Sequence, residues 1–239
     1  MRIKNLLLAI ATLTLVSATP VKHQFTAAEQ QQISISTPGL FSRSNAFNID
    51  LDALKPNEYS FPLPVGKATL RKNNVVEITT KDGDAVKAMF EGTVRLSRKQ
   101  PDNGYVIVIR HRNGLETVYA NNAENVVEVG QHVRAGQTIA IVGQRNGKFY
   151  CDFSIMIDGK RINPTAVVGL GSHRLHRHIL LCEKQYNYIN VSTIGEKVDF
   201  DESTNFTTED VFTKQSTYKW NLEEMKKLSL IHISEPTRP

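Results

Sequence analysis

The chain has 239 residues, with 29 Lys and Arg against 24 Asp and Glu, 40% hydrophobic residues and only two cysteines. This composition is too apolar and too weakly charged for a wholly disordered chain. Two cysteines in this length exclude both a small disulfide-built protein and a zinc module made of several cysteines. The formal net charge of +5 has to be corrected for both ends of the chain before it indicates an acidic partner.

Residues 1–18 have the pattern of a secretory signal peptide. Arg2 and Lys4 form a basic start, an apolar run of eleven residues spans 6–16, and small residues at 16–18 suit a cleavage site. At roughly 1.5 Å per residue, the apolar run spans only about half of the ~30 Å hydrocarbon core of a membrane. We therefore expect an exported protein with no transmembrane anchor after cleavage.

The other end of the chain, 228–239, reads LSLIHISEPTRP. This segment resembles the in-frame translation of a transposase-based sequencing-library adapter, and we interpret it as an artefact of that origin. Without both ends the chain loses three basic residues and one acidic residue, so its net charge falls from +5 to +3. This excess is too small to indicate nucleic acid as a partner.

The mature chain is predicted to have three parts. Residues 19–45 are rich in Gln, Ser and Thr with little periodicity and are predicted to be a linker. A β domain is expected over 46–168. Residues 169–227 are predicted to be a C-terminal extension, with the start of a truncated second module as the alternative, because residues 219–226 faintly resemble 51–55.

Short β-branched runs fill the domain, and Asp-Gly and Asn-Gly turn signals separate them. The six runs are 75–78, 92–96, 105–110, 115–119, 138–142 and 153–157. A six-residue repeat, at 83–88 and again at 130–135, favours two related hairpins around one core. Short strands at this spacing predict an all-β, antiparallel sandwich or barrel rather than alternating strands and helices.

Three segments of the domain, 105–120, 129–143 and 158–164, resemble the lysostaphin-type (LytM-like) zinc endopeptidases of bacterial cell walls. The resemblance covers about residues 68–165 with its spacing preserved. It implies an all-β fold of the duplicated hybrid motif type, barrel-sandwich-like, followed by a partly irregular C-terminal extension. It also implies a periplasmic or extracellular location in a bacterium and peptidoglycan as the relevant polymer.

The positions that carry chemistry in this family are altered. Catalytic zinc needs three protein ligands and an open position, and hydrolysis needs histidines that move protons. Asn73 and Glu77 stand where the family has His-x-x-x-Asp, Asn121 replaces the next histidine, and Tyr150 and Asp152 replace His-x-His. We therefore expect no metal ligand, no zinc cofactor and no catalytic residue, with Asn121 and Tyr150 as degenerate catalytic positions.

The same five residues are predicted to form a polar binding groove with satisfied hydrogen bonds. The alternative is a Mg²⁺ or Ca²⁺ site at Glu77 and Asp152, because carboxylate oxygens suit hard cations.

The remaining histidines and the cysteines offer little further chemistry. His111 and His132 are predicted to be surface residues of strands or turns. The histidines within 173–178 alternate with arginines and predict a solvated basic loop, with adventitious metal binding as the alternative. Cys151 and Cys182 either form a disulfide, worth roughly 3 kcal/mol if unstrained, or are two buried thiols. The sequence does not decide between these two states.

The resemblance and the altered positions together predict an exported, catalytically degenerate peptidase-like module. Its expected role is to bind peptidoglycan peptides or to regulate a cell-wall hydrolase, in the manner of an amidase activator, so its expected partners are peptidoglycan or a cell-wall amidase. The alternative is an active zinc metalloendopeptidase that cleaves peptidoglycan cross-link peptides. A lipoyl or biotinyl carrier is rejected, because residues 87–89 do not form a Met-Lys-Met-type hairpin tip.

Overall fold

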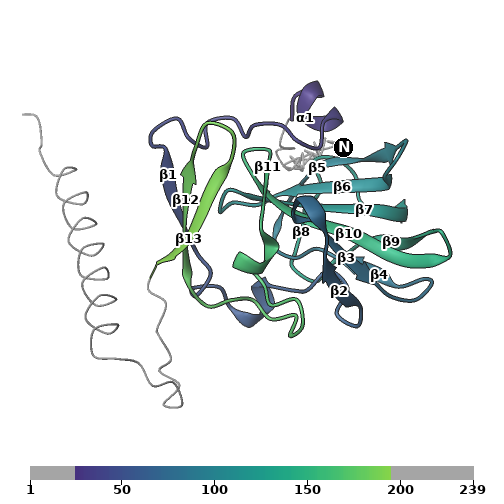
Figure 1. The fold of residues 1–239 in the computed structure, drawn as a ribbon. Helices are drawn as coiled ribbons and strands as arrows, with labels where there is room; N and C mark the ends of the chain where they lie inside the picture. The colour runs from purple at the N-terminus through teal and green to yellow at the C-terminus, as the bar shows by residue number, and fades with distance from the viewer. Residues whose placement is uncertain (1–24, 195–239) are drawn as a thin grey trace, which may run out of the picture. The chain divides into compact units, whose positions relative to one another are not determined.

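A computed structural model describes residues 25–194 (Figure 1). The predicted signal peptide, the extension beyond residue 194 and the adapter-like segment lie outside the described residues. Within residues 25–194, no helix is long and apolar enough to cross a membrane.

The main sheet contains ten strands, and all of its pairings are antiparallel. Its principal order is β2-β3-β10-β9-β7-β6-β5-β8; β4 pairs with β9, β11 pairs with β10, and β10 also pairs with β7. The strands are β2 (Lys67–Leu70), β3 (Val76–Thr79), β4 (Ala85–Lys87), β5 (Gly92–Gln100), β6 (Gly104–Arg110), β7 (Leu115–Asn125), β8 (His132–Val133), β9 (Thr138–Arg145), β10 (Lys148–Ile157) and β11 (Lys160–Ile162). The predicted all-β, antiparallel fold is confirmed, and each of the six predicted runs lies in or largely overlaps a strand.

The sheet is covered on both faces, which explains why β6 is apolar at consecutive positions. Ile107 and Ile109 point into the larger hydrophobic core, whereas Val106 and Val108 belong to a second cluster on the opposite face. All four side chains have no exposed surface. Because neighbouring side chains of a strand point to opposite faces, a strand buried on both sides loses the alternation of apolar and polar residues.

A smaller sheet joins residues from either side of the main sheet in the sequence. Its order is β1-β12-β13, with β1 (Ala46–Asp50) pairing with β12 (Ile179–Lys184), which pairs with β13 (Ile189–Ile194) (Figure 1). Ile49, Leu180 and Cys182 are buried in the larger core. The described part of the C-terminal extension therefore shares a core with the main sheet.

The remaining regular elements are short. They are the helix α1 (Ala27–Gln31) and the 3-10 turns η1 (Pro56–Glu58), η2 (Lys72–Asn74) and η3 (Pro164–Ala166). In contrast with the linker expected over 19–45, the segment 25–37 is fastened to the sheet. Arg95 of β5 is fully buried and donates hydrogen bonds to the backbone carbonyls of Glu29, Gln32 and Ile33. We call residues 25–37 the N-terminal strap.

One histidine prediction is wrong and one is confirmed. His111 is buried, not on the surface: its Nδ1 lies 2.8 Å from the Glu91 carbonyl oxygen and its Nε2 2.8 Å from the Thr117 hydroxyl. His132 is exposed, as predicted.

The segment 173–178 is not simply a solvated loop. The ring of His173 stacks on Phe61 at 3.9 Å, His176 stacks on His178 at 5.5 Å, and His178 Nε2 donates to the Ala166 carbonyl oxygen at 2.9 Å. Cys151 and Cys182 are both buried as free thiols, so the second of the two states left open by the sequence is the one found.

Candidate functional site

The pairing of β3 with β10 brings two carboxylates together. Glu77 lies directly opposite Asp152 in the antiparallel register, so both side chains leave the same face of the sheet. Tyr150, two residues before Asp152 on β10, shares that face, whereas Cys151 between them is buried on the other. The three positions predicted from β3 and β10 therefore form one half-buried patch where these two strands pair.

Asn121 closes one side of this patch from the neighbouring strand β7. It is buried and adopts a left-handed backbone conformation with φ of 61°, which asparagine tolerates better than most residues. Its Nδ2 donates to the carbonyl oxygens of Tyr150, at 2.8 Å, and Gly143, at 3.3 Å. A Cβ atom on Gly143 would lie 2.2 Å from the Asn121 carbonyl oxygen, so only glycine permits this approach. The Asn121 amide thus ties β7 to β9 and β10.

Asn73 is the least engaged of the five predicted residues. It lies in η2, immediately before β3, is exposed, and has a left-handed backbone with φ of 60°. The structure thus brings Glu77, Asn121, Tyr150 and Asp152 together and leaves Asn73 at the margin.

The electrostatics of the patch are those of two opposed like charges surrounded by arginines. Burial, and then the nearby charge of Glu77, raise the pKa of Asp152, whereas Arg145, Arg71 and Arg161 act in the opposite direction. Glu77 itself is held by an ion pair with Arg71 at 2.5 Å.

Neighbouring groups respond to the same environment. Burial raises the pKa of Tyr150, and the Asp152 charge adds to that effect. Burial also raises the pKa of the Cys151 thiol, so this cysteine is not a ready nucleophile.

The donor set does not fit zinc. Protein zinc sites combine imidazole or thiolate ligands with, in some cases, a carboxylate, whereas the four residues of the patch offer two carboxylates, one amide and one phenol, with no imidazole and no thiolate. One carboxylate is already paired with Arg71, and two further arginines lie close enough to act on the other. Among residues 25–194, no cluster of three or more His, Cys, Asp or Glu side chains is arranged to hold a metal ion.

Three arginines were missed by the sequence analysis. Arg71 precedes β3, Arg145 ends β9, and Arg161 lies in β11. An arginine has no characteristic spacing relative to a carboxylate that it meets across strands, so only the pairing register reveals the contact. Only Arg71 could have been suggested from the sequence as a partner of Glu77, because it stands six residues before Glu77 at the turn into β3.

Comparisons with known proteins agree with the resemblance in the sequence. Residues 71–164 match the family described as Peptidase family M23. The chain is 36% identical over 96 residues to murein hydrolase activator EnvC of Escherichia coli (strain K12), covering 38% of this chain and 22% of the relative. It is 35% identical over 95 residues to stage II sporulation protein Q of Bacillus subtilis (strain 168), covering 37% and 34%.

A third relative is named as an enzyme. The chain is 29% identical over 101 residues to DD-carboxypeptidase/endopeptidase Mpg of Neisseria meningitidis serogroup B (strain ATCC 13091 / M2091), covering 41% of this chain and 23% of the relative. The matched segment thus spans between about a fifth and a third of the length of these relatives. The resemblance seen in the sequence is confirmed, because residues 71–164 match the model of Peptidase family M23.

Proposed function

We propose that this chain is an exported, catalytically degenerate M23 module that regulates a cell-wall hydrolase, in the manner of an amidase activator. One observation carries the proposal. Each of the four positions at which the lysostaphin-type resemblance calls for an imidazole holds a different residue: Asn73, Asn121, Tyr150 and Asp152. Asn121 at one of them, and Glu77 at the family's Asp position, have other partners. The amide of Asn121 is used to bind the carbonyl oxygens of Gly143 and Tyr150, and Glu77 is paired with Arg71.

A site of this composition is suited to binding rather than hydrolysis. Peptide hydrolysis requires a polarised carbonyl, an activated water and a group that returns a proton to the leaving amine. The patch offers a phenol whose pKa is raised and two carboxylates that repel each other. The same groups, with Arg71 and Arg145 beside them, are good hydrogen-bonding partners for the amides of a peptide.

The relatives support a regulatory role. EnvC is named a murein hydrolase activator and is 36% identical over the matched segment. Residues 1–18 have the pattern of a secretory signal, which suits a protein that acts on the cell wall. The patch of Glu77, Asn121, Tyr150 and Asp152 is the surface that we assign to the binding of peptidoglycan or of the hydrolase.

The second candidate is an active zinc metalloendopeptidase that cleaves peptidoglycan cross-link peptides. The name of the relative Mpg, a DD-carboxypeptidase/endopeptidase, favours it. It requires a set of metal ligands that the patch does not supply.

The regulatory function is tested by mixing the purified protein with a cell-wall amidase of the same organism and purified, dye-labelled sacculi. We expect the amidase to release dye several-fold faster in the presence of the protein. A rate that stays at that of the amidase alone, over an excess of the protein, would exclude the activator role.

A matched pair of variants locates the regulatory surface. Tyr150→Ala removes a half-buried phenol from the patch and should abolish most of the stimulation. Tyr186→Ala removes a fully exposed tyrosine from the turn between β12 and β13 and should leave the stimulation unchanged. Equal stimulation by both variants would show that the regulatory surface lies outside the patch that contains Tyr150.

A further inference from the structure

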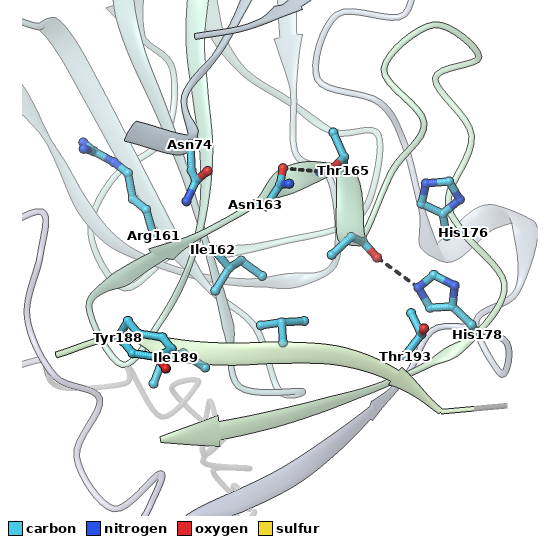
Figure 2. Close-up of a pocket in the computed structure, with 12 residues that line it drawn as sticks. Asn74, Arg161, Ile162, Asn163, Thr165, His176, His178, Tyr188, Ile189 and Thr193 are labelled. Atoms are coloured by element: carbon cyan, nitrogen blue, oxygen red, sulfur yellow. Dashed lines mark hydrogen bonds between the residues drawn. The ribbon is translucent and has the colours of Figure 1, made fainter. Parts of the chain in front are cut away.

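A cavity of about 570 Å³ lies between η3, β11 and β13 (Figure 2). None of the four patch residues lines it. Two histidines, His176 and His178, lie at one end of the cavity, in the segment that leads into β12. Both lie beyond residues 71–164, which match the peptidase family. The cavity therefore offers side chains that take no part in the candidate site.

The fold fixes the backbone of both histidines. The His176 amide donates to the Val167 carbonyl oxygen at 2.9 Å, and the His178 carbonyl oxygen accepts from the Leu51 amide at 3.1 Å. Leu175, immediately before them, is buried. The two imidazoles are therefore placed by the surrounding structure, unlike those of a solvated loop.

No arginine or lysine side chain occupies the histidine end of the cavity. Arg177, between the two histidines, donates through Nη1 to the carbonyl oxygens of Asp52 and Leu54. Arg161 is the one arginine or lysine among the twelve lining residues, and Figure 2 shows its side chain pointing away from the cavity. A cation at the histidine end therefore meets no fixed positive charge among these side chains.

The separation of the two rings suits a shared metal ion. The ring planes of His176 and His178 differ by 15°, and their centroids are 5.5 Å apart. Direct face-to-face contact brings rings much closer, as the 3.9 Å between His173 and Phe61 shows. Two imidazoles bound to one tetrahedral ion, with metal–nitrogen distances of about 2.0–2.1 Å, have centroids roughly 5 Å apart. The observed separation is close to that of two ligands of one ion.

Each histidine has a ring nitrogen available to a ligand. Nε2 of His178 lies 2.9 Å from the Ala166 carbonyl oxygen, a contact drawn as a dashed line in Figure 2. Because a carbonyl only accepts, Nε2 carries the proton and Nδ1 of the neutral ring keeps its lone pair. A carbonyl that holds the second nitrogen in this way is the usual support of a metal-binding histidine. Within residues 25–194, the His176 ring forms no hydrogen bond or ion pair.

From this arrangement we infer that His176 and His178 bind one divalent transition-metal ion at their end of the cavity. Nδ1 of His178 and a ring nitrogen of His176 are the protein ligands, and water from the cavity takes the other positions. Imidazole favours Cu²⁺, Ni²⁺ and Zn²⁺, of which Cu²⁺ binds most tightly, whereas Mg²⁺ and Ca²⁺ prefer oxygen ligands.

The bound ion is exchangeable. Within residues 25–194, no third His, Cys, Asp or Glu completes a set of metal ligands, so the ion keeps open positions. The inference stands independently of the proposed regulatory function, because neither histidine belongs to the patch.

Isothermal titration of the untagged protein with Cu²⁺ tests the inference. His176→Gln and His178→Gln each remove one ligand. His132→Gln is the matched control, because His132 is an exposed histidine that does not line the cavity. We expect a site for one Cu²⁺ per chain, with an affinity that falls at least tenfold in either ligand variant and is unchanged in His132→Gln. Mg²⁺ should give no heat of binding.

Electron paramagnetic resonance of the bound Cu²⁺ separates the loss of a ligand from a change in the fold. The unchanged protein should show nitrogen hyperfine coupling from two imidazoles, and each ligand variant should show coupling from one. Excess Zn²⁺ should also raise the melting temperature of the unchanged protein more than that of either variant, because the ion binds the folded state. Absence of Cu²⁺ binding at submillimolar concentration, equal affinity in both ligand variants and the unchanged protein, or a spectrum without imidazole coupling would overturn the inference.

Discussion

Two charged regions of the main sheet differ in how their charges are arranged, because one brings opposite charges into contact and the other places two like charges opposite each other. Under the N-terminal strap, Arg95 and Glu116 are both fully buried and pair at 2.8 Å, and Arg110 contacts the same carboxylate at 2.8 Å. At the candidate site, Glu77 and Asp152 are like charges that face each other across β3 and β10. The first region neutralises its charges internally, whereas the second keeps two negative charges together.

The strap region has the features of a structural device. Arg95 is the extra residue of a β-bulge between Val94 and Leu96, which turns its side chain toward the strap. Glu29 of α1 completes the cluster through an ion pair with Arg110 at 2.8 Å. All three side-chain nitrogens of Arg95 are hydrogen-bonded within the cluster, whereas Nη2 of Arg110 is buried without a hydrogen-bond partner in the described part of the chain. Because Arg95 is bonded to the strap carbonyls, the cluster is expected to fix the position of the strap.

The candidate site has the features of a binding surface. Burial and Glu77 both disfavour the charged form of Asp152, which is a free-energy cost that the fold alone does not require. Its arginines are at the edge and accessible rather than buried: the Arg71 side chain is 50% exposed. Two like charges retained in an accessible patch are more typical of a functional site than of a core.

Among the substitutions considered for the two regions, removal of Arg95 is expected to have the largest effect on stability. Arg95→Met leaves the buried Glu116 carboxylate without its main partner and frees three strap carbonyls, so we expect a loss of about 3–5 kcal/mol in the free energy of unfolding. Chemical denaturation measures it. Arg98→Met, at an exposed position of the same strand, is the control and should change stability little. A small effect of Arg95→Met would mean that the strap cluster does not stabilise the fold.

His111 is a further buried titratable group, and it differs from the strap cluster because its hydrogen-bonding partners are a carbonyl oxygen and a hydroxyl rather than a carboxylate. Burial lowers its pKa from 6.5 to about 4, so the unfolded chain takes up the proton first as the pH falls. The stability contributed by neutral His111 is present above about pH 6.5 and is lost as the pH falls from there toward 4, by roughly 3 kcal/mol in all. In His111→Gln this part of the pH dependence should disappear from urea unfolding curves.

The control for His111 is His132→Gln, which alters an exposed histidine 3.2 Å from Glu91. This substitution should leave unchanged the loss of folding stability that occurs as the pH falls. Parallel pH profiles for the unchanged protein and His111→Gln would contradict the assignment of His111 as a buried neutral base.

The smallest effect is expected at the candidate site. Asp152→Asn removes one of two opposed charges, and because the pKa of Asp152 is raised, its ionised form destabilises the fold at neutral pH. The variant should therefore have a higher melting temperature at pH 7, and the gain should shrink as the pH falls and the native carboxyl becomes protonated. Asp82→Asn, in an exposed turn, provides the baseline. A lower melting temperature for Asp152→Asn would assign Asp152 to the structure rather than to the site.

Much of the fold was predictable because it depends on local patterns. The β-branched runs and the Asn-Gly and Asp-Gly turns identify the strands of the main sheet. The strap was not predictable, because Arg95 holds it through backbone carbonyls, which every residue possesses. The burial of His111 was also missed, since its partners Glu91 and Thr117 meet it only through the pairing of strands.

The candidate site was predictable in its members but not in its electrostatics. The spacing of the resemblance identified Glu77, Asn121, Tyr150 and Asp152, and the strand register brings them together. Their arginine neighbours come from the residue before η2, from β9 and from β11, with no pattern in the sequence. The cavity between η3, β11 and β13 depends on a strand beyond the resemblance, so no motif pointed to it.

The proposal that the M23-like domain over residues 71–164 does not hydrolyse peptidoglycan is tested most directly by muropeptide release. Purified sacculi are incubated with the protein alone in the presence of added zinc, and soluble muropeptides are separated by liquid chromatography. We expect no release above that of the buffer. Release of muropeptides that stops when a chelator is added would contradict it.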